Sequence, residues 1–352
     1  MSNDLHGAVG AIGTPVEATD GDSPVDWREI DVRAAAARIA GHVIRTPLLR
    51  LPLATPTGDA VYVKPESLQR TGSFKLRGAT NFVANLSQDD RAKGLVAHSS
   101  GNHAQGVAAA AKAFGMAATI VIPEGAIEMK VANTEALGAT VVRSPNTQEG
   151  REGTARDIAQ RAGAVMTPPY DHPDIVAGQG TVGLEIVEDL PDVANVIVPI
   201  GGGGLSAGVA IAVKRGNPAC QVIGVEPALA ADAQQSLREG RRVRWPASSV
   251  NQTAADGVRT QAIGVLNFAV LSELMTGVVT VDEAAIADAV RWYATTAHLV
   301  AEPTGALSLA ALRRLLAEGS ADGVTLRPGP TVVIMSGGNV DPAALCTILG
   351  AA

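Results

Sequence analysis

The sequence contains few of the features on which disulfide-stapled or membrane-spanning proteins depend. Only two cysteines occur among 352 residues, Cys220 and Cys346, which predicts buried thiols in a reducing compartment rather than a disulfide framework. No apolar run approaches the about 18 residues that a membrane helix requires. The N-terminal stretch also lacks the basic and apolar segments of a signal peptide. We therefore expect a cytoplasmic protein with no membrane partner.

Basic runs and aromatic residues are equally scarce. The net charge is −7, and no run of Lys or Arg is longer than two residues, so nucleic acid is not an expected partner. Aromatic residues make up 3% of the chain, whereas glycine occurs 38 times. This balance favours an α/β protein with many tight turns over a β-sandwich. The expected ligand is a small solute.

Short apolar segments rich in β-branched residues alternate with alanine-rich stretches after Trp27. The predicted strands are 61–64, 94–97, 118–123, 140–143, 195–200, 221–226 and 331–335. The clearest predicted helices are 104–114, 150–161 and 282–297. Such alternation predicts parallel sheets with crossover helices.

The order of these segments predicts two lobes and a terminal arm. Residues 1–26, rich in Gly, Asp, Thr and Pro, are expected to form a flexible arm. We expect a small domain at 90–165, inserted in a large domain made of 27–89 and 166–352. A ligand would bind in the cleft between the lobes, at the carboxyl ends of the strands.

Four consecutive glycines, Gly201 to Gly204, separate an apolar strand from an alanine-rich helix in VIVPIGGGGLSAGVAIAVK, residues 196–214. Glycine lets the backbone form a nest of N–H groups, and the start of the helix adds a positive dipole end. The segment predicts a phosphate site. The spacing fits neither a Walker loop nor a GxGxxG fingerprint; the remaining alternative is a turn that only packs a helix on the sheet.

Two further strand ends carry polar side chains. SSGNHAQG, residues 99–106, places Ser99, Ser100 and Asn102 at a helix start, where they could receive a carboxylate or could only cap the helix. VVIMSGGNVD, residues 332–341, ends a strand with Ser336, whose hydroxyl could bond a heteroatom of a bound ring or could belong to a simple turn.

A single lysine, Lys75, lies in SLQRTGSFKLRGATNF, residues 67–82, between Phe74 and Leu76. A lysine forms a Schiff base with an aldehyde only when its amine loses its proton, which a dry site favours. A phosphate site, a carboxylate receptor, a strand-end serine and such a lysine together indicate pyridoxal 5'-phosphate and an amino-acid substrate.

SFKLRGA, SSGNHAQGVA, GGGGLSAG and SGGNVD follow one another between residues 73 and 341. In this order they resemble the serine/threonine dehydratase and serine racemase family of fold-type II pyridoxal-phosphate enzymes, which are tryptophan synthase β-like. The resemblance covers nearly the whole chain after about residue 28 and implies two lobes, each with a twisted, mostly parallel sheet flanked by helices. It also implies a homodimer.

The resemblance implies catalytic and cofactor-binding roles for individual residues. Lys75 would hold the cofactor and act as the base on one face of the substrate Cα. The other residues expected at the cofactor are Phe74 and Gly257 on the two faces of its ring, Asn102 at the ring hydroxyl, Gly201, Gly202, Gly203, Gly204 and Leu205 at the phosphate, and Ser336 at the ring nitrogen.

Ser100 resembles the serine of racemases and 3-hydroxyaspartate dehydratases, where threonine dehydratases usually have alanine. It could exchange a proton on the face opposite Lys75 or could only cap the helix. Glu226, Ala230 and Asp232 have the spacing of the cation site of the racemase branch, which predicts Mg²⁺, with Ca²⁺ or Mn²⁺ as alternatives. Surface acids would be the alternative explanation of this spacing.

Other positions favour a dehydratase. Tyr170 resembles threonine dehydratases, and His298 stands where nucleotide-regulated racemases have lysine. The substrate is expected at Ser99, Ser100, Asn102 and His103. Arg151, or else Arg259, could bind a second carboxylate, or both arginines could be solvated.

We therefore expect an ammonia-lyase that converts L-threonine, L-serine or 3-hydroxyaspartate into a keto acid and ammonia by β-elimination. Serine racemisation that uses Lys75 and Ser100 as two bases is the nearest alternative. A β-replacement enzyme of the cysteine synthase type is more distant, because that branch typically has Thr-Gly after the asparagine of the receptor loop. A non-catalytic amino-acid sensor is disfavoured by Lys75, Ser100 and the glycine loop.

Overall fold

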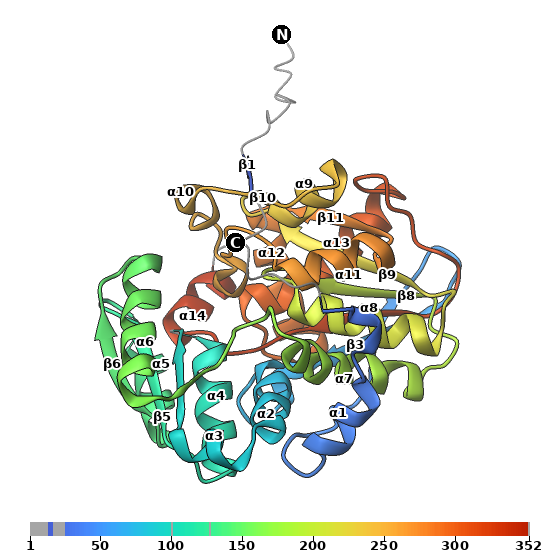
Figure 1. The fold of residues 1–352 in the computed structure, drawn as a ribbon. Coiled ribbons are helices and arrows are strands. Elements are labelled where there is room, and N and C mark those ends of the chain that lie inside the picture. Colours follow the sequence, from blue (N-terminus) through green and yellow to red (C-terminus); the bar gives the residue numbers. More distant parts are fainter. Residues whose placement is uncertain (1–12, 17–24, 100, 127, 351–352) are drawn as a thin grey trace.

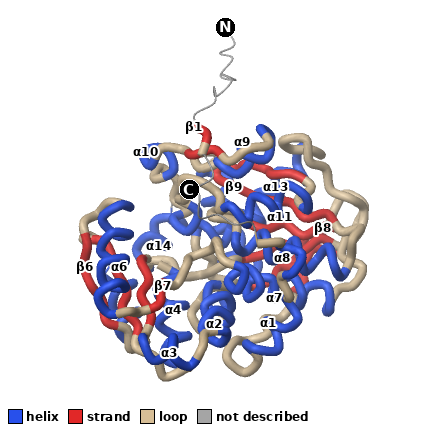
Figure 2. Tube along the Cα trace, viewed as in Figure 1, coloured by secondary structure: helices blue, strands red, loops and turns tan. Residues whose placement is uncertain are grey.

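The structure, a computed structural model, describes residues 13–16, 25–99, 101–126 and 128–350. Its core is formed by two separate sheets, one of six strands and one of four, with helices around both (Figures 1 and 2). The expected α/β fold with two mostly parallel sheets is confirmed.

The larger sheet has the strand order β11-β9-β8-β12-β3-β2. Its strands are β2 (Leu49–Ala54), β3 (Ala60–Pro65), β8 (Asn195–Pro199), β9 (Gln221–Pro227), β11 (Gly277–Val281) and β12 (Thr331–Met335). All neighbouring pairs are parallel except β2 with β3. The central strands are buried along their whole length, as expected for a parallel sheet covered on both faces.

Helices pack on both faces of the larger sheet and enclose two hydrophobic cores. One face carries α1 (Val32–Ile39), α7 (Pro173–Asp189), α8 (Gly204–Gly216) and α11 (Val265–Leu274). The other face carries α12 (Glu283–Trp292) and α13 (Pro303–Glu318). Apolar side chains from sheet and helices fill both layers, so the larger sheet is a rigid support for the loops at its carboxyl edge.

The smaller sheet has the order β6-β5-β4-β7, and all its neighbouring pairs are parallel. Its strands are β4 (Leu95–His98), β5 (Ala118–Pro123), β6 (Thr140–Ser144) and β7 (Val165–Met166). One face packs against α2 (Lys75–Asn85), α4 (Asn102–Ala113) and α5 (Glu128–Ala136), and the other against α6 (Gln148–Ala162). Because α2 also packs against α7, it connects the two sheets, and Lys75 is its first residue.

The remaining elements are short. They are β1 (Thr14–Pro15), β10 (Val243–Arg244), α3 (Gln88–Lys93), α9 (Asp232–Glu239), α10 (Ala247–Val250), α14 (Pro342–Gly350), three 3-10 turns at Trp27–Glu29, Glu66–Leu68 and Asp256–Val258, and a π turn at Tyr293–Ala297. Within the predicted arm, residues 1–12 and 17–24 lie outside the described residues. Thr14–Pro15 is not a free segment, because it pairs with β10.

All seven predicted strands are present within two residues of their expected ends. The predicted helix 282–297 is only partly right, since α12 ends at Trp292 and a π turn follows. Both cysteines are free, and Cys220 is buried as predicted, whereas Cys346 is exposed on α14, so that part of the prediction was wrong. The assignment of residues to two domains stays a prediction.

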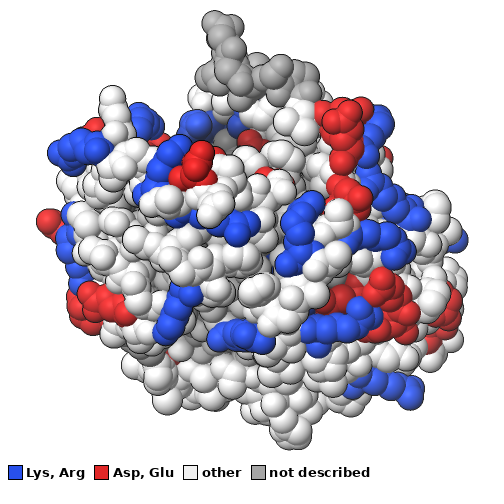
Figure 3. Space-filling view, turned by 60° about the horizontal axis from the view of Figure 1, so that its bottom comes forward, with Lys and Arg blue, Asp and Glu red and all other residues white. Residues whose placement is uncertain are grey.

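No helix in the described part of the chain is long and apolar enough to cross a membrane. On the face shown in Figure 3, basic and acidic side chains are interspersed. The homodimer and the cytoplasmic location stay predictions.

Candidate active site

A cavity lies at the carboxyl ends of β8 and β12, next to the N-termini of α2 and α8. Its lining is formed by Phe74, Lys75, Pro169, Tyr170, Ile175, Gln179, Pro199, Gly201, Gly202, Gly203, Gly204, Leu205, Gly257, Val258, Thr304 and Ser336. Lys75, the glycine loop and Ser336 are separated by more than 100 residues in sequence, and the structure brings them to one place. Open parallel sheets bind ligands at this edge.

Among the residues that the structure describes, no carboxylate pairs with Lys75. Its Nζ donates a hydrogen bond to the backbone carbonyl of Pro169 at 2.7 Å and lies 5.3 Å from the centre of the Phe74 ring. Part of the residue is open to the cavity, but the surrounding protein desolvates the amine and lowers the pKa of Lys75 to about 8. About a tenth of the amine is therefore neutral at pH 7, compared with far less for an ordinary lysine, and a nucleophile or base requires this neutral form.

The glycine loop meets the cavity where α8 begins. The cap residue Gly203 has φ +93° and makes no side-chain capping bond, so the first N–H groups of α8 have no side-chain partner. A Cβ on Gly202 would lie 2.3 Å from the Tyr170 ring, which shows how closely that ring packs on the loop. The free N–H groups and the helix dipole together suit a phosphate.

Three residues that were not predicted from the sequence hold this loop and the adjoining start of α11 in place. The Asn267 amide donates to the carbonyl of Gly202 at 2.7 Å, and Asp171 accepts hydrogen bonds from Val265 N–H and Leu266 N–H at 2.8 and 3.1 Å. The N–H of Gly264 also donates to the carbonyl of Gly202 at 3.1 Å. Gly264 and Asn267 belong to no motif singled out in the sequence, whereas Asp171 directly follows Tyr170, which resembles threonine dehydratases.

Ser336 follows β12 directly and is almost fully buried. Its hydroxyl donates to the carbonyl of Thr304 at 3.4 Å, and its own carbonyl accepts from Phe74 N–H at 3.1 Å. The Thr304 hydroxyl in turn accepts from Gly257 N–H at 3.0 Å. Thr304 therefore joins two predicted cofactor residues, although it was not itself predicted as a site residue.

The receptor loop lies beside this cavity, at the start of α4. Asn102 is the first residue of α4, and its amide is placed between Glu302 and Asn339. The hydroxyl of Ser99 accepts from Gly101 N–H at 3.2 Å. Ser100 lies outside the described residues, so its predicted role as a second base stays a prediction.

His103 is buried behind the loop, with Nε2 at 3.3 Å from the carbonyl of Thr167. Burial lowers the pKa of His103 to about 3, and the charge of Lys75 acts in the same direction. The imidazole is therefore neutral. His103 and Arg151 do not line the cavity.

Arg151 and Arg259 behave differently. Arg259 donates from Nε and Nη2 to the carbonyl of Thr253, at 2.9 and 2.6 Å. Arg151 lies on α6 close enough to His98 to affect its pKa, which burial lowers and which the charges of Glu152, Arg151 and Arg156 also shift. Since His98 directly precedes the receptor loop, Arg151 is near the receptor loop even though it does not line the cavity.

The predicted cation residues form a pair of buried carboxylates. Glu226 accepts from the N–H groups of Ala233 and Gln234 at 3.0 and 2.7 Å, whereas Oδ2 of buried Asp232 has no hydrogen-bond partner. Burial raises the pKa of Glu226, further raised by Asp232, and burial raises the pKa of Asp232 to about 7. Ala230 is buried beside them.

No group of three His, Cys, Asp or Glu side chains in the described ranges could hold a metal ion. A cation at Glu226 and Asp232 would therefore need backbone carbonyl or water ligands as well.

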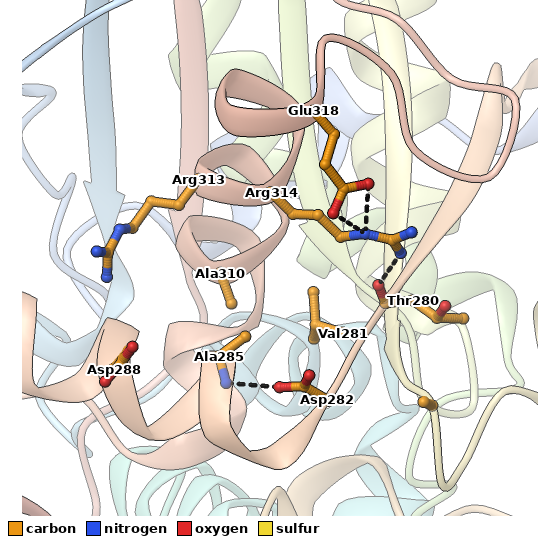
Figure 4. Close-up of a pocket in the computed structure, with 10 residues that line it drawn as sticks. Thr280, Val281, Asp282, Ala285, Asp288, Ala310, Arg313, Arg314 and Glu318 are labelled. Atoms are coloured by element: carbon orange, nitrogen blue, oxygen red, sulfur yellow. Dashed lines mark hydrogen bonds and ion pairs between the residues drawn. The ribbon is translucent and has the colours of Figure 1, made fainter. Parts of the chain in front are cut away.

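A larger cavity, of about 470 Å³, lies elsewhere between β11, α12 and α13 (Figure 4). Arg314 in this cavity already donates to Glu318 at 3.1 Å and to the carbonyl of Thr280 at 2.8 Å, and Asp282 caps α12. None of the predicted site residues lines it. The smaller cavity is the candidate active site because of the chemistry of its lining residues, not because of its volume.

A desolvated lysine facing an uncapped helix start is typical of enzymes that bind a phosphorylated aldehyde cofactor. The chain belongs to the family of pyridoxal-phosphate dependent enzymes, whose family model matches residues 39–337. Its cofactor is accordingly pyridoxal phosphate.

The chain is similar to two kinds of ammonia-lyase and to a serine racemase. It is 42% identical over 312 residues to an L-threonine ammonia-lyase of Thermotoga maritima, covering 88% of this chain and 75% of that protein. It is 39% identical over 325 residues to an L-threo-3-hydroxyaspartate ammonia-lyase of Saccharomyces cerevisiae, covering 91% and 95%. The solved structure of maize serine racemase superposes with a TM-score of 0.83 at 37% identity, covering 92% of this chain and 95% of that one.

Proposed function

We propose that this protein is a pyridoxal-phosphate-dependent ammonia-lyase that acts on a β-hydroxy amino acid. The main observation behind the proposal is that Lys75, the start of α8 and Ser336 all line one cavity. The similarity to threonine and 3-hydroxyaspartate ammonia-lyases supports the same reaction class.

The residues present fit the cofactor. When bound, pyridoxal phosphate supplies an aldehyde that joins to an amine and a ring that accepts electrons from the substrate Cα. Lys75 would form the covalent bond, and the N–H groups of residues 201–205 would bind the phosphate at the positive end of α8. Phe74 and Gly257 would lie against the two faces of the ring.

Lys75 would also move the proton of the substrate Cα. The desolvation that lowers its pKa leaves the amine ready to accept a proton near neutral pH. Pro169, whose carbonyl accepts from Nζ, would orient the amine when it is free. Loss of the β-hydroxyl as water then leaves an enamine, which hydrolyses to a keto acid and ammonia.

Ser336 would lie at the ring nitrogen as a neutral group. The bond from its hydroxyl to the carbonyl of Thr304 is long, at 3.4 Å, so the hydroxyl would turn to donate to an unprotonated ring nitrogen. A serine does not force protonation of the ring nitrogen as an aspartate would, so electron withdrawal is weaker. This favours prompt loss of a β-substituent over a long-lived carbanion.

The substrate carboxylate would bind at the start of α4, near Ser99, Ser100, Asn102 and His103. The cap residue Gly101 makes no side-chain capping bond, which leaves N–H groups for an anion. Arg151 near this loop supports a substrate with a second carboxylate, since guanidinium binds carboxylates bidentately. We therefore rank 3-hydroxyaspartate beside L-threonine and L-serine.

A divalent cation, most simply Mg²⁺, would bind at Glu226 and Asp232 with the carbonyl of Ala230. The support is the chemistry of the site: two buried carboxylates side by side, one with an unpartnered oxygen. A hard cation would satisfy that oxygen and offset the repulsion between the two negative charges.

Serine racemisation is the second candidate, favoured by the similarity to maize serine racemase over most of both chains. It requires a proton donor on the face of Cα opposite Lys75, and Ser100 is the residue proposed for that role. Elimination and racemisation share the first step, removal of the Cα proton, so both activities can coexist.

The test is direct. Purified protein is incubated with L-threonine, L-serine, D-serine and the stereoisomers of 3-hydroxyaspartate, and both keto-acid release and chirality are followed. We expect keto acid from at least one β-hydroxy amino acid, and none from the Lys75→Ala variant. Racemisation without any keto acid would support the second candidate and contradict the first.

A further inference from the structure

The amide of Asn102 has its two ends held by different residues. Its Oδ1 accepts a hydrogen bond from Nδ2 of Asn339 at 2.8 Å, and its Nδ2 donates to Oε1 of Glu302 at 2.6 Å. One end of an asparagine amide only accepts hydrogen bonds and the other only donates. The orientation of this amide therefore decides what Asn102 can offer to a ligand.

The orientation is set by a backbone carbonyl, which can only accept. Nδ2 of Asn339 donates to the carbonyl of Thr71 at 2.8 Å as well as to Asn102. Both N–H groups of Asn339 are thus used, and its amide cannot be turned without losing two hydrogen bonds. The oxygen of Asn102 must then face Asn339, and its nitrogen must face the carboxylate of Glu302.

Two glycines leave the space for this chain of contacts. A Cβ on Gly72 would lie 2.4 Å from Oδ1 of Asn339, and a Cβ on Gly337 would lie 2.3 Å from Oε1 of Glu302. The two glycine segments also bind each other, since Gly338 N–H donates to the carbonyl of Gly72 at 2.9 Å.

The same segments position the cofactor residues. Phe74 N–H donates to the carbonyl of Ser336 at 3.1 Å, so the chain before Lys75 and the chain after β12 are fixed together. Nδ2 of Asn102 lies 3.2 Å from the position of a Cβ on Gly337, next to the cavity-lining Ser336. Asn102 itself does not line the cavity, but its Nδ2 carries a second N–H besides the one donated to Glu302.

We propose that Asn339 is a positioning residue, which together with Glu302 fixes the Asn102 amide so that its remaining N–H faces the ring hydroxyl of the bound cofactor. This inference rests on the proposed function, in which the cofactor is joined to Lys75. An N–H donated to that oxygen stabilises its negatively charged form, whereas a turned amide would present a carbonyl oxygen and repel it.

The experiment compares two cofactors in two proteins. Asn339→Leu removes the donor at similar volume, and Asn339→Asp replaces it with a group that only accepts and so attracts the nitrogen of Asn102 away from the ring. Apo-protein is titrated with pyridoxal 5'-phosphate and with its analogue that lacks the ring hydroxyl, 3-deoxypyridoxal 5'-phosphate. The dissociation constants and the visible absorption bands are recorded.

We expect Asn339→Leu to weaken binding of pyridoxal phosphate about tenfold, the usual effect of losing a hydrogen bond to a charged group. Asn339→Asp should weaken it further and shift the absorption band. Binding of the deoxy analogue should change less than about twofold in both variants, because the analogue has no hydroxyl to receive the N–H.

An equal loss of affinity for both cofactors would show a purely structural role and overturn the inference, as would unchanged binding of pyridoxal phosphate. The matched control is Asn85→Leu, since Asn85 is exposed and its amide donates only to Asp174, and we expect no change there. If the Asn339 variants do not fold, Gly337→Ala, which displaces the carboxylate of Glu302, should give the same preference between the two cofactors.

Failure of this inference is distinguishable from failure of the proposed function. If borohydride reduction of the unchanged protein does not attach pyridoxal phosphate to Lys75, the proposed function fails before any variant is made. If attachment occurs but the Asn339 variants bind both cofactors as the unchanged protein does, only the role of Asn339 is contradicted.

Discussion

The N-terminal turn of α2 separates two regions that treat buried charge in opposite ways. Beneath it lies a buried charge cluster, defined as Lys64, Glu66, Arg77 and Glu185, in which every charge has a partner. Nζ of Lys64 lies 2.6 Å from Oε2 of Glu185, and the guanidinium of Arg77 donates to both carboxylates at 2.6 to 3.0 Å. The other region contains Lys75, whose amine donates a hydrogen bond to the backbone carbonyl of Pro169. No carboxylate among the described residues pairs with this amine.

The two lysines show what this difference means chemically. Burial lowers the pKa of both, but Glu185 opposes the shift at Lys64, whereas nothing opposes it at Lys75, whose pKa falls to about 8. A paired buried lysine stays charged and holds elements together, while an unpaired one becomes a reactive amine. Two positions after Lys75 on the same helix, Arg77 supplies the charge that fixes the helix.

The largest expected effect is that of Lys75→Ala on chemistry. In the proposed function Lys75 would both hold the cofactor and move the Cα proton, so its removal should lower kcat by at least about 10³-fold. Stability should change little, because Lys75 holds no charge pair. Keto-acid release and a thermal melt measure the two effects. A variant that retains a tenth of the activity would contradict the role of Lys75.

The second effect falls on the buried charge cluster. Arg77→Met leaves Glu66 and Glu185 buried without their main partner, which should cost about 3 to 5 kcal/mol of unfolding free energy. Urea unfolding measures this loss. The control is Arg28→Met, since Arg28 forms only exposed ion pairs and should change stability by less than about 1 kcal/mol. If both variants lose the same unfolding free energy, the buried charge cluster stabilises the protein no more than exposed ion pairs do, which would contradict the comparison.

The third effect separates substrates. Arg151→Gln should lower kcat/KM for 3-hydroxyaspartate about tenfold, because a charged hydrogen bond to the second carboxylate is lost. Threonine has no such group and should be unaffected within about twofold. If kcat/KM falls equally for both substrates, Arg151 supports the structure around α6 and does not select the substrate.

The smallest effect is a pH dependence. Only the neutral amine attacks an aldehyde, and with a pKa of about 8 the neutral fraction of Lys75 rises about fivefold between pH 7 and pH 8. The rate at which apo-protein captures pyridoxal phosphate should rise by the same factor and level off above about pH 9. A rate that keeps rising steeply to pH 10 would show an ordinary lysine pKa.

The sequence predicted those parts of the site that are encoded in contiguous segments. A lysine at a helix start, glycines 201–204 between strand and helix, and Ser336 after a strand are recognisable because each backbone requirement lies within a few residues. The seven strands could also be predicted, because short runs of β-branched residues followed by glycine turns are typical of strands in an α/β protein.

The contacts between segments could not be predicted in the same way. The carbonyl of Pro169 at Lys75, the hydroxyl of Thr304 at Gly257 and the amide of Asn339 at Asn102 each join residues far apart in the sequence. Asn339 stands inside the SGGNVD motif, yet only the folded structure shows that its side chain contacts Asn102. The π turn after Trp292 breaks the helical period locally, and that period is the signal on which the helix prediction depended.

The most direct test of the central claim is to find which lysine carries the cofactor. The unchanged protein is loaded with pyridoxal phosphate, reduced with borohydride, digested and analysed by mass spectrometry. We expect the label on the peptide that contains Lys75 and none on the peptide that contains Lys64. Label at Lys64 or at an exposed lysine, or no label at all, would contradict the account.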